Sequence, residues 1–366
     1  MVAEMATEGR VPPSPDQLIV RDLQHADAAA WTAFTTTHAD ATLYHTLVWR
    51  DVIQEVFGHR PLYLSCTVAG TVKGILPLFL VRCPFFGSKL VSLPYDVGSG
   101  GALVVDEASE RALAERAIEL GRQLRVNYME LRCKSARPVL EQLGFSRSEP
   151  VLLSEMVLDD ESQVRKRVAP DHRKAIRKAE SRGITVREAN SLEDFRAFYR
   201  VYLQVFRDFG TPPYGAGYFP ALFQRLYPSH AVRLLLAFHE QRCVGGLLLF
   251  CWQTTLVSKF AACLPDAVPL RAYAALYWRA ICLGLEEGYR RLSWGTSSRD
   301  QTGLIEFKER WGAQSHPAVV YALPVTRSVP SIERYYDSGG LARRLWRRLP
   351  LRITPVIGEP LNRWFC

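Results

Sequence analysis

The order of helical and extended patterns in this chain repeats once along its length. In the first half, a helical stretch from Trp31 to Phe57 precedes apolar strands, a helical pattern over Ala108–Leu124 and the strand NYMELRC. In the second half, a helical stretch over Leu192–Phe209 precedes further strands, a helical pattern over 271–287 and the strand RLSW. The chain has 366 residues, which is long for one domain, so we expect two halves of similar fold.

Two local sequence matches support a duplication. The helical segment RAIELG (Arg116–Gly121) corresponds to RAICLG (Arg279–Gly284), and the strand VKGILPL (Val72–Leu78) corresponds to VGGLLLF (Val244–Phe250). Both pairs occupy the same place in their half. Chance similarity between amphipathic segments is the alternative.

We therefore predict an α/β (α+β) fold with two tandem domains, each a mixed and mostly antiparallel sheet flanked by helices. The predicted parts are a flexible leader over 1–16, an N-terminal domain over 17–160, a C-terminal domain over 161–325 with a basic junction helix over 165–182, and a basic amphipathic tail over 326–366.

The second half is longer than the first at one place. Leu131 to Gly144 covers 13 positions, whereas the corresponding Trp294 to Gly312 covers 18. The extra residues fall in the loop TSSRDQTG, and added loop length on a rigid scaffold often carries function. This loop supplies the candidate residues Ser297, Ser298, Arg299 and Asp300.

A helical pattern follows this loop and places a lysine beside an aromatic stripe. Phe307 and Trp311 stand at i, i+4, so they share one face of the helix, and Lys308 lies at its margin. A partly buried ammonium there could stabilise the oxyanion that develops when an amine attacks an ester carbonyl. The alternative is a surface helix on which Lys308 is solvated.

The run RKRVAPDHRKAIRKAESR (165–182) is strongly basic. The whole chain carries a net charge of +9, and this run alone holds eight basic residues. Like charges at i, i+4 repel, so a bound anion is a plausible compensation; the residues concerned are Arg173, Lys174, Arg177 and Lys178. The run lies at the predicted domain junction, where clefts form, and a diphosphate or a tRNA backbone would fit there. A solvated linker helix is the alternative.

The loop PYDVGSGG (94–101) is the third candidate site. It combines Tyr95 and Asp96 with three glycines, among them Gly100 and Gly101. Glycine lets the backbone approach a ligand closely. An ordinary tight loop would show the same composition.

Other patterns limit the class of protein. The eight cysteines form no C-x-x-C pair, and the histidines form no HExxH motif, so we expect a reducing cytoplasmic setting and no metal site. We find neither a secretory signal pattern nor an apolar run of ~18 residues. The tail alternates arginines with bulky apolar residues, which is typical of a segment that lies on a membrane surface. Packing of the tail as a lid is the alternative.

Several motifs, taken in order, resemble a known family. They are YHTLVWRDVIQEVFGHRPLYL (44–64), LVSLPYDVGSGG (90–101), HRKAIRKAESRGI (172–184), GTSSRDQTGLIEFKERWG (295–312) and LWRRLPL (345–351). Together they resemble the FemAB-like proteins of the GNAT acyltransferase superfamily, in particular those associated with exosortase/PEP-CTERM systems. The Q/R-x-x-G-x-G/A loop of enzymes that use acyl-CoA is absent, because the corresponding stretch reads LPDAVPLRAYAA.

The resemblance implies an N-acyltransferase with a BioF2-like acetyltransferase domain in its second half. The acyl donor would be a co-substrate, aminoacyl-tRNA or acyl-CoA, with no tightly bound cofactor, and the acceptor an amine on an anionic precursor of peptidoglycan, exopolysaccharide or another envelope polymer. In this resemblance Phe307 and Lys308 match the catalytic helix, and the 94–101 loop lines the acceptor cleft. No histidine or carboxylate stands out as a general base, and Asp96, Asp300 and Glu306 are the candidates that the sequence offers. An acyl-CoA-dependent N-acetyltransferase and a non-catalytic scaffold that binds tRNA or the inner membrane surface are the alternatives.

Overall fold

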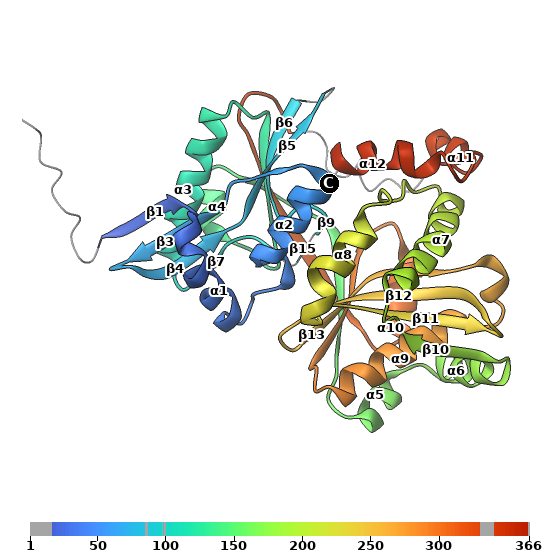
Figure 1. Cartoon of the computed structure of the whole chain (residues 1–366). Coiled ribbons are helices and arrows are strands. Elements are labelled where there is room, and N and C mark those ends of the chain that lie inside the picture. The colour runs from blue at the N-terminus through green and yellow to red at the C-terminus, as the bar shows by residue number, and fades with distance from the viewer. Residues whose placement is uncertain (1–16, 85–86, 97, 99, 330–339, 365–366) are drawn as a thin grey trace, which may run out of the picture.

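The computed structural model describes residues 17–84, 87–96, 98, 100–329 and 340–364, so the predicted leader lies outside the described residues. Figure 1 shows two α/β halves side by side, joined by a sheet that passes from one to the other. Over the described residues this sheet has eleven strands, and a second sheet of four strands lies at the far end of the first half.

The elements of the first half follow the predicted order. Its strands are β1 (Leu18–Asp22), β2 (Arg60–Pro61), β3 (Leu64–Val68), β4 (Thr71–Leu76), β5 (Leu78–Cys83), β6 (Gly87–Ser92), β7 (Leu103–Val104), β8 (Tyr128–Cys133) and β9 (Ser146–Val157). Its helices are α1 (Ala28–Thr37), α2 (Leu47–Phe57), α3 (Glu107–Gln123) and α4 (Pro138–Gln142).

The second half repeats the order and adds a C-terminal helical segment. Its strands are β10 (Ile184–Glu188), β11 (Val232–His239), β12 (Arg242–Trp252), β13 (Thr255–Cys263), β14 (Arg291–Ser298) and β15 (Gln314–Pro324). Its helices are α5 (Glu161–Arg167), α6 (Pro170–Ser181), α7 (Leu192–Phe209), α8 (Tyr218–Leu226), α9 (Ala272–Glu286), α10 (Thr302–Arg310), α11 (Leu341–Trp346) and α12 (Thr354–Trp364).

The two halves exchange their last strands. The large sheet has the order β10-β11-β12-β13-β14-β9-β15-β8-β6-β5-β2, so β9 pairs with β14 of the second half, and β15 pairs with β8 of the first. β9 and β15 also pair with each other at the centre. Strand pairs therefore join residues on either side of the predicted domain boundary at residue 160. The boundary itself stays a prediction.

The predicted strand VKGILPL (Val72–Leu78) belongs to two strands in the structure. It breaks at Pro77 into β4, which belongs to the small sheet, and β5, which belongs to the large one. Proline lacks the backbone N–H that a continuing ladder needs, which explains the break. In β12, the corresponding strand of the second half, the pairing with β13 instead shifts register between Leu248 and Leu249.

The predicted helical stretch from Trp31 to Phe57 is also interrupted. α1 ends at Thr37, a short 3-10 turn covers Leu43–His45, and α2 begins at Leu47. The Thr46 hydroxyl accepts a hydrogen bond from the Trp49 amide and so caps the start of α2. Residues 39–44, which lie between the two helices, line a cavity together with strands of the second half.

The largest apolar core joins the two halves. Trp31, Trp49 and Phe79 of the first half are fully buried in the same cluster as Phe195, Phe219 and Phe250 of the second. α2 packs on α8 within this cluster. Because this core is continuous, it fixes the relative position of the residues that each half contributes to a shared site.

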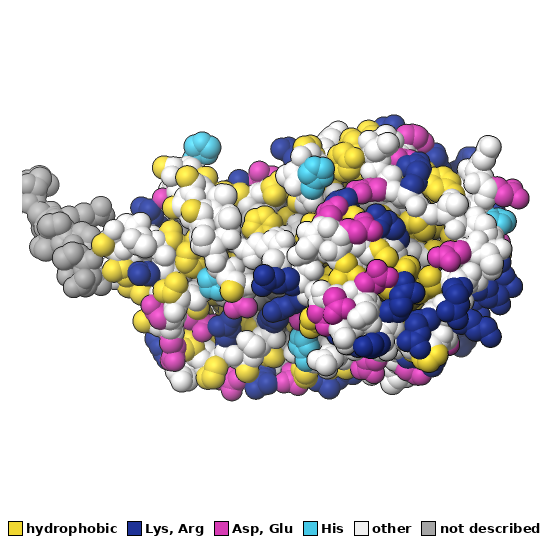
Figure 2. Space-filling view, turned by 90° about the horizontal axis from the view of Figure 1, so that it is seen from below, with side chains coloured by type: hydrophobic (Ala, Val, Ile, Leu, Met, Phe, Trp, Pro, Cys, Tyr) yellow, Lys and Arg dark blue, Asp and Glu magenta, His cyan; other side chains and the backbone are white. Residues whose placement is uncertain are grey.

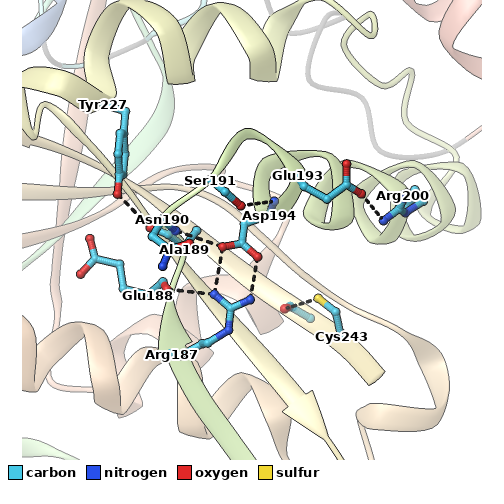
Figure 3. A network of polar contacts seen from close by, with 11 residues as sticks. Arg187, Glu188, Ala189, Asn190, Ser191, Glu193, Asp194, Arg200, Tyr227 and Cys243 are labelled. Carbon is cyan, nitrogen blue, oxygen red and sulfur yellow. Dashed lines mark hydrogen bonds and ion pairs between the residues drawn. The ribbon is translucent and has the colours of Figure 1, made fainter. Parts of the chain in front are cut away.

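A polar network holds the turn from β10 into α7 (Figure 3). The Arg187 guanidinium donates to both carboxylate oxygens of Asp194, at 2.6 and 2.9 Å. Ser191 caps the helix by accepting from the Asp194 amide, and the Asn190 amide donates to the same carboxylate. The network holds the start of α7 against β10 and satisfies one of the backbone amides of the first turn of α7.

Candidate active site

Lys308 lies on α10, the helix that follows the irregular C-terminal end of β14. The register of β14 against β9 shifts between Ser293 and Thr296, and Gly295 within this bulge has a φ of +68°. The Gly295 carbonyl accepts a hydrogen bond from Lys308 Nζ at 2.9 Å. Lys308 is only 4% exposed, so it is more deeply buried than the helical pattern predicted.

An aromatic cluster forms around Phe307 and Trp311, which neighbour Lys308 on α10 and at its C-terminal end. Phe307 is half-buried, with its ring centroid 5.3 Å from that of His172, and His172 lies 4.8 Å from Trp311. Tyr277 and Trp294 complete the cluster at 4.4 Å from each other. Burial lowers the pKa of the Lys308 ammonium to about 8, because an apolar environment disfavours the charged form.

Several buried hydrogen-bond donors at this place have no partner among the described residues. An ammonium has three donors, and for Lys308 the structure provides one acceptor, the Gly295 carbonyl. The Ser297 hydroxyl and the indole nitrogens of Trp294 and Trp311 are buried and unbonded. Buried polar groups are rarely left unpaired, so this cluster suits a ligand that brings acceptor oxygens.

The other predicted residues of the 295–312 stretch have different roles. Arg299 is exposed and donates to the Glu149 carbonyl at 2.7 Å and to the Glu149 carboxylate at 3.1 Å. The Ser298 amide donates to the Gln301 side chain and shapes the turn into α10. Asp300 is exposed in this turn. The structure thus buries Lys308 and Ser297 and leaves Arg299 and Asp300 at the surface.

The 94–101 loop is tightly constrained. Tyr95 has a φ of +70°, its ring stacks on Phe57 at 4.0 Å, and its hydroxyl lies 2.7 Å from His59 Nε2. A side chain at Gly100 would meet Leu93, and Gly101 has a φ of +98°. Strained backbone of this kind persists where the surroundings impose it, often at functional sites.

Lys259 of β13 ties this loop to the second half, and the sequence analysis missed it. Its Nζ donates to the Tyr95 carbonyl at 2.6 Å and lies 5.4 Å from the centre of the Tyr44 ring. Burial lowers its pKa, and the nearby charge of Asp96 partly offsets this effect. A signal was present, because Lys259 is the one charged residue in the apolar strand TLVSKFAAC.

Asp96 lies at the same junction. Its backbone carbonyl accepts from Arg132 Nη1 at 3.0 Å, and Arg132 is itself buried and bonded to Glu130 at 2.7 Å. Burial, and then the charge of Asp96, raise the pKa of the Tyr44 hydroxyl well above its usual range. Asp96, Tyr44 and Lys259 therefore form a polar group between the halves. Of these three residues, the sequence predicts Asp96 alone as a site residue.

A cavity of about 60 Å³ adjoins this group. The link between α1 and α2 covers one side of it, and Gly98 of the predicted loop also reaches it. Alternate residues of β9, β12, β13 and β14 form the opposite wall; they include Leu153, Phe250, Val257 and Ser293. Charged side chains also line it, namely Asp40, Lys134, Glu155 and Arg291.

β14 connects this cavity with the buried lysine. Successive residues of a strand point to opposite faces, so Ser293 lines the cavity while Leu292 and Trp294 pack in the core of the second half. The bulge at Gly295, whose carbonyl holds Lys308, follows immediately. β14 thus contacts the cavity through Ser293 and Lys308 through the Gly295 carbonyl.

The basic helix does not lie in a cleft between the halves, so that expectation is wrong. α6 packs against α9 and β10, the edge strand of the large sheet, because Ile176 and Ala179 face the core of the second half. Its first turn reaches α10, where Asp171 pairs with Arg310 at 2.7 Å.

The outer face of α6 presents unneutralised cations. Arg173 donates to the Arg165 carbonyl, and Arg177 is exposed. The charges of Arg182, Arg271 and Lys174 contribute to lowering the pKa of Lys178, with Arg182 the largest cause. In the described part of the chain, no carboxylate forms an ion pair with Lys174, Arg177 or Lys178. Lys and Arg side chains gather at this end of the molecule in Figure 2.

No group of three His, Cys, Asp or Glu side chains that could hold a metal ion occurs among the described residues. None of their helices is both long and apolar enough to cross a membrane.

Comparison with known proteins shows which fold this is. Residues 165–309 match the model of the acetyltransferase (GNAT) domain family, a region that runs from α5 through Lys308. FemX is 13% identical, with a TM-score of 0.70 over 84% of this chain and 98% of FemX. No curated protein matches the chain by sequence.

Two further solved structures extend the likeness. L-PGS from Bacillus licheniformis is 14% identical, with a TM-score of 0.55 over 82% of this chain and 96% of its own. A tandem GNAT protein from the clavulanic acid biosynthesis pathway is 13% identical, with a TM-score of 0.54 over 86% of this chain and all of its own. At such identities the likeness concerns the fold, and it confirms the predicted α/β class with tandem GNAT-like halves.

Proposed function

We propose that this protein is an N-acyltransferase of the FemAB-like class, which transfers an aminoacyl or acyl group to an amine on an anionic cell-envelope precursor. The GNAT domain match over 165–309 supports acyl transfer. The likeness to FemX, and to structures named after lysylphosphatidylglycerol synthetase and L-PGS, favours an aminoacyl group. The link to exosortase/PEP-CTERM systems and exopolysaccharide rests on sequence resemblance alone.

The observation that carries this proposal is the buried ammonium of Lys308. Within the described part of the chain it has one acceptor, it lies in an apolar surrounding, and buried donors without a partner lie on β14 and at the end of α10. Such a group is suited to receive the negative charge that develops on an acyl oxygen. The amine nitrogen bonds to the acyl carbon, and the carbonyl oxygen becomes an oxyanion beside Lys308. Collapse breaks the bond to the leaving oxygen or sulfur, which takes the proton lost by the amine.

The acceptor would bind between the halves. Tyr44 lines the cavity. Lys259, which donates to the Tyr95 carbonyl, and Asp96, whose charge acts on Tyr44, lie next to it at the junction of the 94–101 loop and β13. Among the three candidate bases, Asp96 is the one that lies at the junction of the halves, so it is the candidate for holding the attacking amine. The outer cations of α6 would bind the phosphates of a tRNA donor or of a diphosphate precursor.

An acyl-CoA donor is the second candidate, and one observation favours it. Arg271 precedes α9 with a φ of +69°, and the α9 amides of the first turn have no side-chain cap. Together with Lys178 and Arg182, this helix start could hold a diphosphate, although the stretch lacks glycine.

A donor screen tests the proposal. Binding is measured as the shift in melting temperature with acetyl-CoA, aminoacyl-tRNA and lipid-linked sugar diphosphates, and transfer is then measured with labelled donors and an amine-bearing envelope precursor. We expect aminoacyl-tRNA to give product that depends on Lys308. Product from acyl-CoA alone would support the second candidate, and no product from either donor class would contradict acyl transfer.

A further inference from the structure

The C-terminal segment has an inner face that packs across both halves. Asn362 Nδ2 donates to the carbonyls of Pro212 and Pro213 at 3.1 and 2.9 Å, and a side chain at Gly358 would collide with Pro213. The Arg363 guanidinium lies against Gly58 of the first half. Figure 1 shows α12 lying over the junction of the halves, with α11 continuing beyond it. Thr354 and Gly358 are buried at i, i+4, which defines the inner face of α12.

The outer face of the same segment exposes large apolar side chains. Ile353, Val356 and Ile357 follow the i, i+3, i+4 spacing of one helical stripe and are 44, 71 and 38% exposed. Leu345 on α11 is 57% exposed, whereas Trp346 next to it is buried. The segment therefore packs on the protein with one face and exposes an apolar stripe to water on the other.

Arginines surround this apolar stripe. Residues 340–364 contain six arginines and a single carboxylate, Glu359. Arg344, Arg347, Arg348 and Arg352 are exposed beside Leu345 and Ile353. Apolar residues flanked by arginine suit the boundary between acyl chains and anionic headgroups, where both kinds of side chain find partners.

We propose that the outer face of α11 and α12, defined by Leu345, Ile353, Val356, Ile357 and the arginines beside them, binds the surface of an anionic lipid bilayer. The inner face anchors the segment to both halves, so the bilayer would orient the whole molecule and not only a tail. A second copy of the chain is a poorer occupant, because two such faces would bring their arginines together.

Vesicle co-sedimentation of the full chain tests this proposal. We expect binding to vesicles of phosphatidylglycerol and phosphatidylcholine, and weak binding to phosphatidylcholine alone. The variant L345D/V356D should lose about ten-fold or more in affinity, since two apolar contacts become charged. The variant R344S/R348S should lose about 25-fold at low salt, from about five-fold for each arginine.

The matched control is V105D/V157D, which adds the same charges at valines that are 57 and 60% exposed outside the segment. It should bind vesicles like the wild type. All variants alter exposed side chains, so melting temperatures should stay close to that of the wild type. Equal binding by L345D/V356D and the control would overturn the proposal, and so would a wild type that dimerises through this face without binding vesicles. Neither result would affect acyl transfer to a soluble acceptor.

Discussion

At the scale of single residues, the role of Lys308 can be tested by replacing it with methionine, which removes the charge and keeps most of the volume. We expect kcat to fall by about 10²-fold or more, the size typical of a lost oxyanion donor. If the ammonium is the active form, the wild-type rate should decline above a pH of about 8, where the lysine loses its proton. A rate that rises through that pH would indicate a base instead.

The same substitution should not destabilise the fold at neutral pH. The pKa of Lys308 is lowered by burial from 10.5 to about 8, so the buried ammonium costs about 3 kcal/mol at pH 7. Between pH 8 and 10.5 the unfolded state holds more protons, and this cost disappears as the pH rises. Lys308→Met relieves this cost but also leaves the Gly295 carbonyl without its donor, a loss of about 1.5–3 kcal/mol. Its melting temperature should therefore stay close to that of the wild type at pH 7 and fall below it near pH 10. Lys73→Met, on the half-exposed Lys73 of β4, is the control and should show neither effect.

Lys259 offers a test of the site between the halves. Lys259→Met removes the hydrogen bond to the Tyr95 carbonyl, and such bonds to charged groups contribute about 1.5–3 kcal/mol. We expect KM for the amine acceptor to rise by about ten-fold or more, with a smaller change in kcat and in KM for the donor. A lower melting temperature with unchanged KM would show that Lys259 only supports the fold.

These two lysines also show how far the sequence could predict the site. Aromatic residues at i, i+4 and the family resemblance point to Lys308, but the packing of α10 also depends on His172 and Trp294, which contact Trp311 from other elements. Lys259 was a lone charge in an apolar strand, which is a local signal that was overlooked. Its partner, the Tyr95 carbonyl, comes from the other half, so no local pattern could have assigned its role.

At the scale of elements, α6 provides a prediction about the anionic substrate. Lys174→Glu with Lys178→Glu reverses two charges on the outer face of α6, so KM for a tRNA or diphosphate substrate should rise steeply, and wild-type affinity should weaken with salt. The control is Arg122→Glu with Arg125→Glu, two exposed arginines of the first half. A KM that is insensitive to salt, or an equal effect of both double variants, would remove α6 from substrate binding.

The elements themselves were predicted well where the signal is local. The alternation of strands and helices and the hairpins follow from periodicity and turn residues. The predicted loop over 296–303 is shorter in the structure, because β14 continues to Ser298 and α10 begins at Thr302. The breaks at Pro77 and between α1 and α2 were missed, although proline is a known local signal. The position of α6 was missed because Ile176 and Ala179 find their core only in the folded second half.

At the scale of the whole molecule, the exchange of β9 and β15 could not be predicted from sequence. Each of these strands follows its own half in the chain, and an ordinary tandem arrangement would show the same order of patterns. Their pairing depends on contacts between residues about 170 positions apart, such as Ser148 with Val320. Because of this exchange, residues of both halves line the cavity. The candidate site therefore needs both halves to form.

This exchange predicts that the two halves unfold together. Calorimetry of the wild type should show one transition, because β9 and β15 share the central pairing and the largest core joins both halves. Ala318→Asp would bury an unpaired carboxylate between these strands, beside Val151 and Leu153, and should cost several kcal/mol. We expect the single transition to move to lower temperature as a whole, whereas Val157→Asp, at an exposed position of β9, should leave it nearly unchanged. Two separate transitions, or a shift confined to one of them, would show that the halves are stable independently in spite of the exchanged strands.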